Sequence, residues 1–360
     1  MKNFFSRYKK LHIWLLVLLF LLALFLIFRT DRDLMNWLVT EVTQPMKDAV
    51  ASVCYLVSFP VIEILYILAG AWVVIHIVVS AVKIHRSKGR RRSAAYRSFL
   101  ILLCVVLTVA DWFCLVWGIN YYADGFQEKS GLYAQEVDAS ELYRVTAYFT
   151  EQVNAASQAI PRDENGLFAV SREEIFAAST SIYENLCDEF PFLERQDRVP
   201  KPMIFSKLLS AMGFTGFYAG FTGESVLNVD SPAAYLPCTI AHELAHQRGI
   251  ASEQECNFIA ILASTQSGNP VYAYSGYLTG YVHLSNALYR ADREAWQELR
   301  SQLDEGVLAD IQNNSIYWDQ WESPIDTVSN AIYDTMLKSY GQSDGIQSYG
   351  TVVDLLVAYY

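Results

Sequence analysis

The residues best suited to chemistry lie in one short segment, AHELAHQRGIASEQECN at positions 241–257. It contains a His-Glu-x-x-His motif made by His242, Glu243 and His246. On a helix, two His residues four positions apart project from the same face. Two imidazoles at this spacing can bind one Zn²⁺, and Glu243 can accept a proton from a water molecule that the ion activates. The motif predicts a zinc site whose chemistry is metal-assisted hydrolysis.

The residues around the motif predict the helices that must position it. Pro237 suits the first turn of a helix that carries the motif, and Gly249 is a natural stop for it. The pattern Ser252-x-x-Glu255 predicts a second helix with a capping box, in which Glu255 reaches back to the backbone of Ser252. This assignment leaves Glu253 at the start of the second helix, where the short turn can return it towards the two His residues.

The order His-Glu-x-x-His then Glu-x-x-x-Asn resembles the gluzincin branch of zinc metallopeptidases. The resemblance implies that Glu253 is the third zinc ligand and that Asn257, which can hydrogen-bond a ligating group, supports the site. Many gluzincins have a longer gap than the one between His246 and Glu253. Glu255 therefore stays open as the alternative third ligand. A metzincin arrangement would place the third ligand at Ser252, which cannot fill that role.

Charge divides the chain into two parts. Residues 1–119 carry 14 Lys/Arg and 6 Asp/Glu, whereas the other 13 Lys/Arg and 32 Asp/Glu lie in residues 120–360. The basic part also contains long apolar segments. We predict a membrane domain over residues 1–120, with spans at about 11–28, 62–82 and 98–120 and a cytoplasmic loop at 83–97. The piece Ala49–Pro60 is too short to span and is interpreted as an interfacial or re-entrant helix.

Basic residues predict the orientation of the spans. Four Lys/Arg precede the first span and seven lie in the loop 83–97, so both segments are expected in the cytoplasm. Residues 121–360 then lie on the extracytoplasmic side of the cell membrane. No small-residue cleavage site follows the first apolar run, which favours an uncleaved span. The cluster Arg90–Arg92 is interpreted as a topology anchor, and Asp111 as a polar contact within the helix bundle.

In the outer domain, residues 121–360, polar and apolar residues alternate with the periodicity typical of a folded, mainly helical domain. Helices are predicted at 140–159, from Ser171 to about residue 190, and at 271–293, 294–303 and 323–339. Short strands are predicted at 201–205 and 225–230, and residues 217–228 are expected to supply a sheet edge that binds substrate backbone. The fold class expected is three N-terminal transmembrane α-helices with a mainly helical α+β, zincin-like extracytoplasmic domain.

The outer domain has other side chains that could bind a metal or take part in catalysis, but a structural role is the simpler interpretation for several of them. Cys187, Cys238 and Cys256 have no paired spacing, so no disulfide framework is predicted. His283 lies on an apolar helix, where a core or groove-lining role is favoured over a fourth ligand. Tyr349, Tyr272 and His283 are candidate oxyanion donors that the sequence does not rank.

The whole chain resembles an uncharacterised family of bacterial membrane-anchored zincins, a domain of unknown function. The resemblance rests on the spans, on YAGFTGESVLN, on the HELAHQRG and EQECNF core, and on GQSDGIQSYGTVVDLL near the C-terminus. It implies a zinc-dependent peptidase with a peptide or protein substrate, anchored in the lipid bilayer. A non-catalytic zinc-binding sensor or scaffold is the alternative. The acidic outer domain disfavours nucleic acid as a partner, and the polar residues around the motif exclude an intramembrane protease.

Overall fold

The computed structural model describes residues 6–340 and 350–360, and the chain divides into two compact units. Unit 1 comprises Met1–Cys54, Val61–Ala123 and Gly220–Thr222. Unit 2 comprises Tyr55–Pro60, Asp124–Ala219 and Gly223–Tyr360. The chain therefore leaves unit 1 for a short stretch at 55–60, before the second long apolar helix begins.

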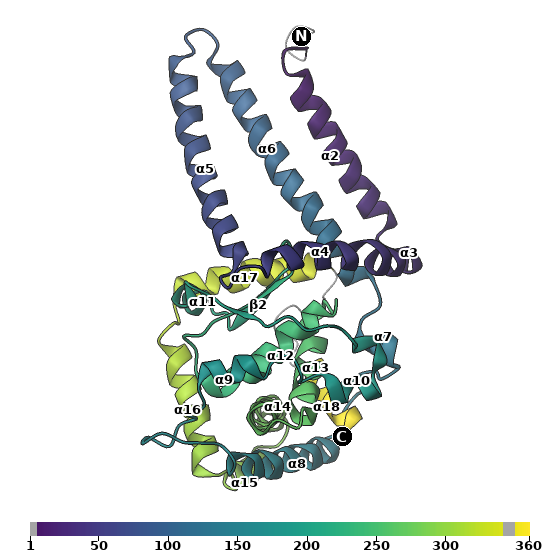
Figure 1. The fold of residues 1–360 in the computed structure, drawn as a ribbon, viewed down its shortest axis with the longest axis vertical. Coiled ribbons are helices and arrows are strands. Elements are labelled where there is room, and N and C mark those ends of the chain that lie inside the picture. The colour runs from purple at the N-terminus through teal and green to yellow at the C-terminus, as the bar shows by residue number, and fades with distance from the viewer. Residues whose placement is uncertain (1–5, 341–349) are drawn as a thin grey trace. The chain divides into compact units, whose positions relative to one another are not determined.

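Unit 1 is built from helices, three of which are long and apolar enough to cross a membrane: α2, α5 and α6 (Figure 1). Its elements are α2 (Lys9–Phe28), α3 (Arg32–Leu38), the π-helical turn η1 (Val39–Thr43), α4 (Gln44–Cys54), α5 (Val61–Arg86), α6 (Arg91–Val116) and the 3₁₀ turn η2 (Gly118–Tyr122). The three helices expected from the apolar runs are confirmed. Most of their side chains are exposed in the absence of lipid, as suits surfaces that lipid would cover.

The boundaries in unit 1 differ from the sequence prediction in three places. The loop predicted at 83–97 is mostly helical, because α5 runs on to Arg86 and α6 starts at Arg91. Lys and Arg are good helix formers, so these helices continue beyond their apolar cores. The third helix ends at Val116, and the short helix predicted at 49–60 instead covers Gln44–Cys54. The polar contact expected for Asp111 is not found, since its carboxylate oxygens have no hydrogen-bond partner among the described residues.

Unit 2 is mainly helical with one small sheet. Its helices are α7 (Phe126–Ser130), α8 (Ala139–Ser157), α9 (Arg172–Ala177), α10 (Glu184–Glu189), η3 (Pro191–Leu193), α11 (Ser206–Ala211), η4 (Ala233–Tyr235), α12 (Leu236–Gln247), α13 (Glu253–Gln266), α14 (Pro270–Ala291), α15 (Arg293–Arg300), α16 (Glu305–Asp319), α17 (Pro324–Ser339) and α18 (Gly350–Tyr359). Its strands are β1 (Lys201–Pro202), β2 (Gly216–Ala219) and β3 (Glu224–Leu227).

Three helices, α12, α13 and α14, pack against one another at the centre of unit 2 (Figure 1). α8 covers α14 on another side, and α18 packs on α13. Every residue of α13 from Phe258 to Ser264 is buried, which explains why its sequence is apolar all round rather than on one stripe. The helix that carries His-Glu-x-x-His is therefore held inside the core rather than on the surface.

The sheet has the strand order β1-β3-β2, with β1 parallel and β2 antiparallel to β3. β3 is fully buried and central, and β2 lies at an edge among the described strands. The prediction that residues 217–228 supply the edge is thus half correct, because β2 is the edge and β3 is not. A buried ion pair, Lys201 Nζ to Glu224 Oε1 at 2.7 Å, joins β1 to β3.

Most predicted helices of unit 2 are confirmed: α8, α14, α15 and α17 begin and end within three residues of their expected bounds. The helix predicted from Ser171 is wrong in its length. Ser171 does cap α9, accepting a hydrogen bond from the Glu174 backbone, but α9 stops at Ala177. The chain then turns so that the buried Tyr183 donates a hydrogen bond to the Ala241 carbonyl of α12 at 2.7 Å. This long-range contact overrides the local helical pattern.

Candidate metal centre

The helix α12 displays His242 and His246 on one face because of residues at its two ends. Pro237 lies in its first turn, as expected. After the last turn, Gly249 adopts a left-handed conformation with φ 86°, and its backbone N–H bonds to the His246 carbonyl at 3.0 Å. A residue with a side chain would be strained there. The turn reverses the chain and brings the start of α13 back over α12.

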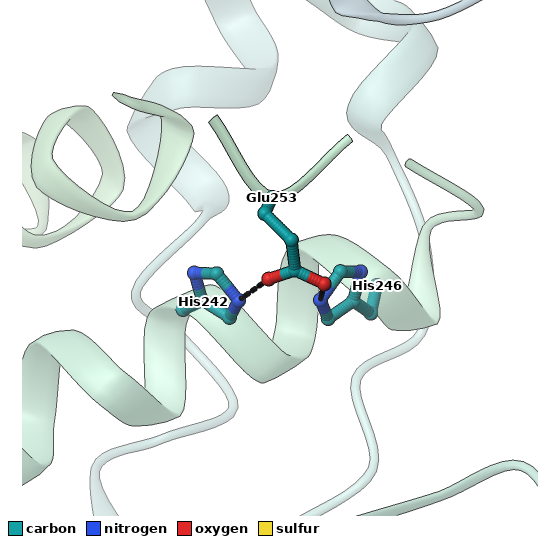
Figure 2. Close-up of side chains that lie close together, drawn as sticks. All are labelled: His242, His246 and Glu253. Carbon is teal, nitrogen blue, oxygen red and sulfur yellow. Dashed lines mark hydrogen bonds and ion pairs between the residues drawn. The ribbon is translucent and has the colours of Figure 1, made fainter. Parts of the chain in front are cut away.

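This reversal brings the carboxylate of Glu253 between the two imidazoles (Figure 2). Glu253 Oε2 lies 3.1 Å from His242 Nε2, and Glu253 Oε1 lies 3.6 Å from His246 Nε2. One ligand atom from each of the three residues lies within 4.8 Å of the others. The three residues predicted as ligands are therefore brought together, in a site largely shielded from solvent.

The far side of each imidazole is held by a hydrogen-bond acceptor. His242 Nδ1 lies 2.8 Å from Asn257 Oδ1, and His246 Nδ1 lies 2.8 Å from the Ile250 carbonyl oxygen. A carbonyl oxygen can only accept, so Nδ1 of each ring carries its proton. In a neutral imidazole, the Nε2 lone pair then points at Glu253. Asn257 thus supports the cluster as its spacing predicted, whereas the role of Ile250 had no signal in the sequence.

The cluster fits a divalent cation by the chemistry of its donor set. Two Nε2 lone pairs facing one carboxylate would repel it unless positive charge lies between them. One proton can supply that charge at one ring only, and protons on both rings would leave excess positive charge at a desolvation cost. One divalent cation can reach all three groups. Two imidazoles and one carboxylate form a ligand set that zinc takes in proteins. Within the described residues, this is the group of His, Cys, Asp and Glu side chains that meets the distances for a metal.

Glu253 is additionally held by a tyrosine that the sequence did not single out. Tyr333 of α17 donates a hydrogen bond to Glu253 Oε1 at 2.5 Å. Burial opposes ionisation of Glu253, but when the neighbouring His246 and His242 carry positive charge they hold the pKa of this carboxyl well below its usual range. Tyr333 lies 80 residues downstream on another helix. No spacing rule connects the two, so only the tertiary structure identifies it.

Glu243 occupies a different environment from the three ligand residues. Only 3% of it is exposed, and its Oε2 has no hydrogen-bond partner among the described residues. Burial, with the charges of His242 and Glu253 as smaller and opposing influences, raises the pKa of Glu243 to about 8. Burial thereby strengthens this carboxylate as a proton acceptor, as a general base requires.

The edge strand β2 passes directly beside Glu243. A Cβ atom built on Gly216 would lie 3.1 Å from Glu243 Oε1 and 3.0 Å from the Val226 carbonyl oxygen. Glycine is therefore required for this close approach of backbone to carboxylate. On the same strand, the ring of Tyr218 lies 6.4 Å from that of His246. The strand β2 thus lies beside the face of α12 that carries Glu243 and His246.

Glu255, the alternative third ligand, faces away from the cluster and has other partners. Its two carboxylate oxygens accept hydrogen bonds from the backbone N–H groups of Phe126 at 2.8 Å and Gln127 at 3.1 Å. The capping box is therefore half correct. Ser252 Oγ does accept from the Glu255 backbone, but the Glu255 side chain binds the start of α7 instead of returning to Ser252. A contact 129 residues away in the sequence replaces the local one.

The remaining candidates lie near the site or elsewhere in unit 2. His283 of α14 has its pKa lowered to about 4 by burial and by the neighbouring His242, yet it is not among the three clustered ligands. Tyr272 donates its hydroxyl proton to the Ile175 carbonyl at 2.9 Å, so that proton is committed to the core. Tyr349 lies outside the described residues. All six cysteines are free, and Cys256 is buried with Sγ 3.3 Å from His246 Nδ1.

These features define a class of protein: three helices that could span a membrane, and a mainly helical second unit that holds a His-His-Glu cluster beside a three-stranded sheet. A family model described as protein of unknown function (DUF3810) matches residues 39–357, and the chain belongs to this family. No curated protein and no solved structure matches the chain.

Proposed function

We propose that the protein is a membrane-anchored zinc metallopeptidase that hydrolyses peptide bonds. The observation that carries this proposal is the orientation of the two imidazoles. Asn257 and Ile250 hold the Nδ1 protons, so that both Nε2 atoms face the Glu253 carboxylate. Such a cluster is suited to zinc, and the buried Glu243 lies on the same helix beside it.

His242, His246 and Glu253 would hold the zinc ion. When bound, zinc polarises the scissile carbonyl and makes a water molecule more acidic. Glu243 accepts the proton of the attacking water and then passes it to the leaving amine. Its Oε2, buried and without a partner among the described residues, is an acceptor suited to that proton.

The edge of β2 would bind the substrate in extended form. Backbone groups on an edge strand can pair with those of a peptide, and the side chains of alternate substrate residues then face the strand. Gly216 brings this edge against Glu243, so a peptide paired with β2 passes next to the general base. A peptide or protein is therefore the substrate class we propose, with β2 setting its direction.

We place unit 2 outside the cytoplasm on the basis of charge. Lys83, Arg86 and the basic residues that begin α6 flank the α5–α6 connection, and basic residues are retained on the cytoplasmic side. Protease treatment of intact cells should degrade unit 2 and spare this connection. Protection of unit 2 in intact cells, with cleavage only after lysis, would reverse the orientation.

The activity is tested with the full chain in lipid nanodiscs. A peptide library is incubated with zinc-loaded protein, with chelator-treated protein, and with treated protein after zinc is restored. We expect cleavage in the first and third samples and its loss in the second. Cleavage that persists without metal would refute the metallopeptidase. A protein that binds about one zinc per chain and cleaves no peptide would instead favour the non-catalytic sensor.

A further inference from the structure

The exposed large apolar side chains of unit 2 are concentrated in three segments. Of twelve such residues in its described part, two lie in 55–60, four in 199–208 and three in α17. The other three are scattered over α16, α14 and the segment before α8. Scattered apolar residues are ordinary on a soluble surface, but a concentration of them marks a binding surface.

The helix α17 has an apolar face that points away from its own unit. Ile325, Val328 and Ile332 are 59%, 58% and 67% exposed, at the three- and four-residue spacing that aligns side chains on one helical face. Between Pro324 and Thr335 the exposed positions of this helix carry no charge. The opposite face bears Tyr333 and the buried Leu337. The helix is amphipathic, with its apolar side outward.

The other two segments adjoin this helix within unit 2. The loop after α11 meets α17, since a Cβ on Gly213 would lie 3.2 Å from the Asn330 side chain. Phe214 packs edge to face on Tyr333, with ring centroids 5.4 Å apart. At the other end, Lys201 Nζ donates to the Phe59 carbonyl at 3.0 Å. The segment 199–214 therefore links 55–60 to α17.

One part of this surface, the stretch from residue 198 to 223, differs in charge from the rest of unit 2. Residues 120–360 carry 32 acidic side chains, yet the stretch between Asp197 and Glu224 contains none. It does contain the exposed Lys207, beside the exposed Leu208. Apolar side chains combined with basic residues are typical of surfaces that lie in the interface of a bilayer.

We infer that the apolar face of α17, together with residues 199–208, lies in the lipid interface of the membrane. The connection between this surface and a long apolar helix indicates that lipid covers the surface. Residues 55–60 belong to unit 2, and Val61, the next residue, begins a helix that could span the membrane. Residues 55–60 are fixed within unit 2 by the hydrogen bond from Lys201 to Phe59, so the chain enters this apolar helix directly from the surface described above. Such a connection keeps the surface near lipid.

Lipid contact by α17 would bear directly on the metal cluster. One face of this helix presents Ile325, Val328 and Ile332, and another presents the Tyr333 hydroxyl to Glu253 Oε1. Lipid that orders α17 therefore also positions a hydrogen-bond donor on a candidate ligand. The lipid contact itself does not depend on peptidase activity, so it stands or falls separately from the proposed function.

The test places a fluorescent probe on this surface in the full chain. In a Cys187→Ser background, which removes the one half-buried thiol, Val328→Cys is labelled with an environment-sensitive dye. The matched control is Ile316→Cys on α16, an apolar residue with 51% exposure outside the surface. Leu208→Cys provides a second position in 199–208. Nanodiscs contain phosphatidylcholine and phosphatidylglycerol, some of it nitroxide-labelled near the headgroup.

We expect nitroxide lipid to quench the probes at Val328 and Leu208 and to leave the probe at Ile316 unchanged. Iodide in the buffer should quench only the probe at Ile316. If iodide quenches all three probes equally, the surface faces water and the inference is wrong. If the Val328 probe resists both quenchers, and does so only when two chains share a nanodisc, a second copy covers the surface in place of lipid.

Discussion

Two of the clusters of charged side chains in unit 2 differ in how fully the protein satisfies their hydrogen-bonding and charge requirements. In one cluster, Asp310 accepts hydrogen bonds from Arg162 Nη1 at 2.6 Å, from the Tyr274 hydroxyl at 2.5 Å and from the Phe168 backbone at 2.9 Å. Both of its oxygens are thus bound by protein donors. In the other cluster, the carboxylate of Glu253 faces two imidazoles whose Nδ1 protons are already engaged.

The difference separates a structural ion pair from a candidate metal site. A buried charge is stable when hydrogen bonds and an opposite charge surround it, as they do around Asp310. In the cluster on α12 and α13, the Nε2 lone pairs of two imidazoles face the Glu253 carboxylate. The Oε2 of the adjacent Glu243 has no hydrogen-bond partner among the described residues. A cation and its water would complete that second cluster, whereas the first is complete in itself. Four predictions test this comparison.

The largest effect is expected from the two glutamates at the start of α13. Glu253→Gln removes the anionic ligand, so the purified full chain should lose its zinc, measured by elemental analysis. Glu255→Gln is the matched control, because it lies two residues away and its carboxylate binds the Phe126 and Gln127 backbone. If Glu255→Gln loses zinc and Glu253→Gln keeps it, Glu255 is the third ligand and Glu253 is not.

A large effect on rate, without loss of metal, is expected from Glu243→Gln. The amide keeps the shape of the side chain but cannot accept the proton, and general base catalysis contributes about 10²–10⁴-fold. Peptide hydrolysis should fall by that factor while zinc content stays at the wild-type level. Wild-type turnover in Glu243→Gln would show that Glu243 is not the general base. Loss of zinc from this variant would show that Glu243 is a metal ligand.

A substitution in the Asp310 cluster should lower the free energy of unfolding and leave zinc binding unchanged. Asp310→Asn leaves Arg162 without its charge partner, and breaking a buried pair costs about 3–5 kcal/mol of unfolding free energy. Denaturant titration of the full chain in detergent should show this loss, with zinc content per folded chain unchanged. Asp319→Asn, an exposed carboxylate on the same helix, is the control and should behave as wild type. Reduced zinc in folded Asp310→Asn would mean that the two clusters are coupled.

The smallest effect is expected from the support to His242. Asn257→Ala removes the acceptor that holds Nδ1, and loss of such a partner weakens metal affinity by about 10–100-fold. Competition with a chelator of known affinity measures the change. Asn286→Ala, at an exposed position of α14, should leave the affinity unchanged. Equal affinity in Asn257→Ala would show that the imidazole is oriented by packing rather than by this hydrogen bond.

The sequence predicted the parts of the candidate site that follow from local spacing. His242 and His246 share a helical face by periodicity, and Gly249 ends the helix so that Glu253 returns to them. The position of Asn257 follows from its place one turn along α13. Tyr333 and the partners of Glu255 could not be predicted in this way. Their contacts join residues 80 and 129 positions apart, and no local rule specifies such contacts.

The fold shows the same division between local and long-range determinants. Apolar runs predicted the three long helices of unit 1, because their length and composition are sufficient evidence. The break between α9 and α10 was not predictable, because it depends on long-range contacts of the buried Tyr183. Its hydroxyl donates a hydrogen bond to the Ala241 carbonyl, and the Arg248 guanidinium lies 3.6 Å from the centre of its ring. Two of the three strands, β1 and β3, were located but predicted too long, because pairing with neighbouring strands sets where each one ends. The third, β2, was predicted only as part of the edge segment 217–228.

The hydrogen bonds that Glu255 accepts from α7 can form only late in the synthesis of the chain. Phe126 and Gln127 are made soon after the third long helix, and the ribosome must add more than a hundred further residues before their acceptor exists. Glu253 is made in the same turn of helix as that acceptor. Because domains assemble as the chain emerges, the first helix of unit 2 becomes fastened at the same stage as the candidate metal ligands become complete. The contact that fixes α7 and the candidate metal cluster therefore become possible at the same late point in synthesis.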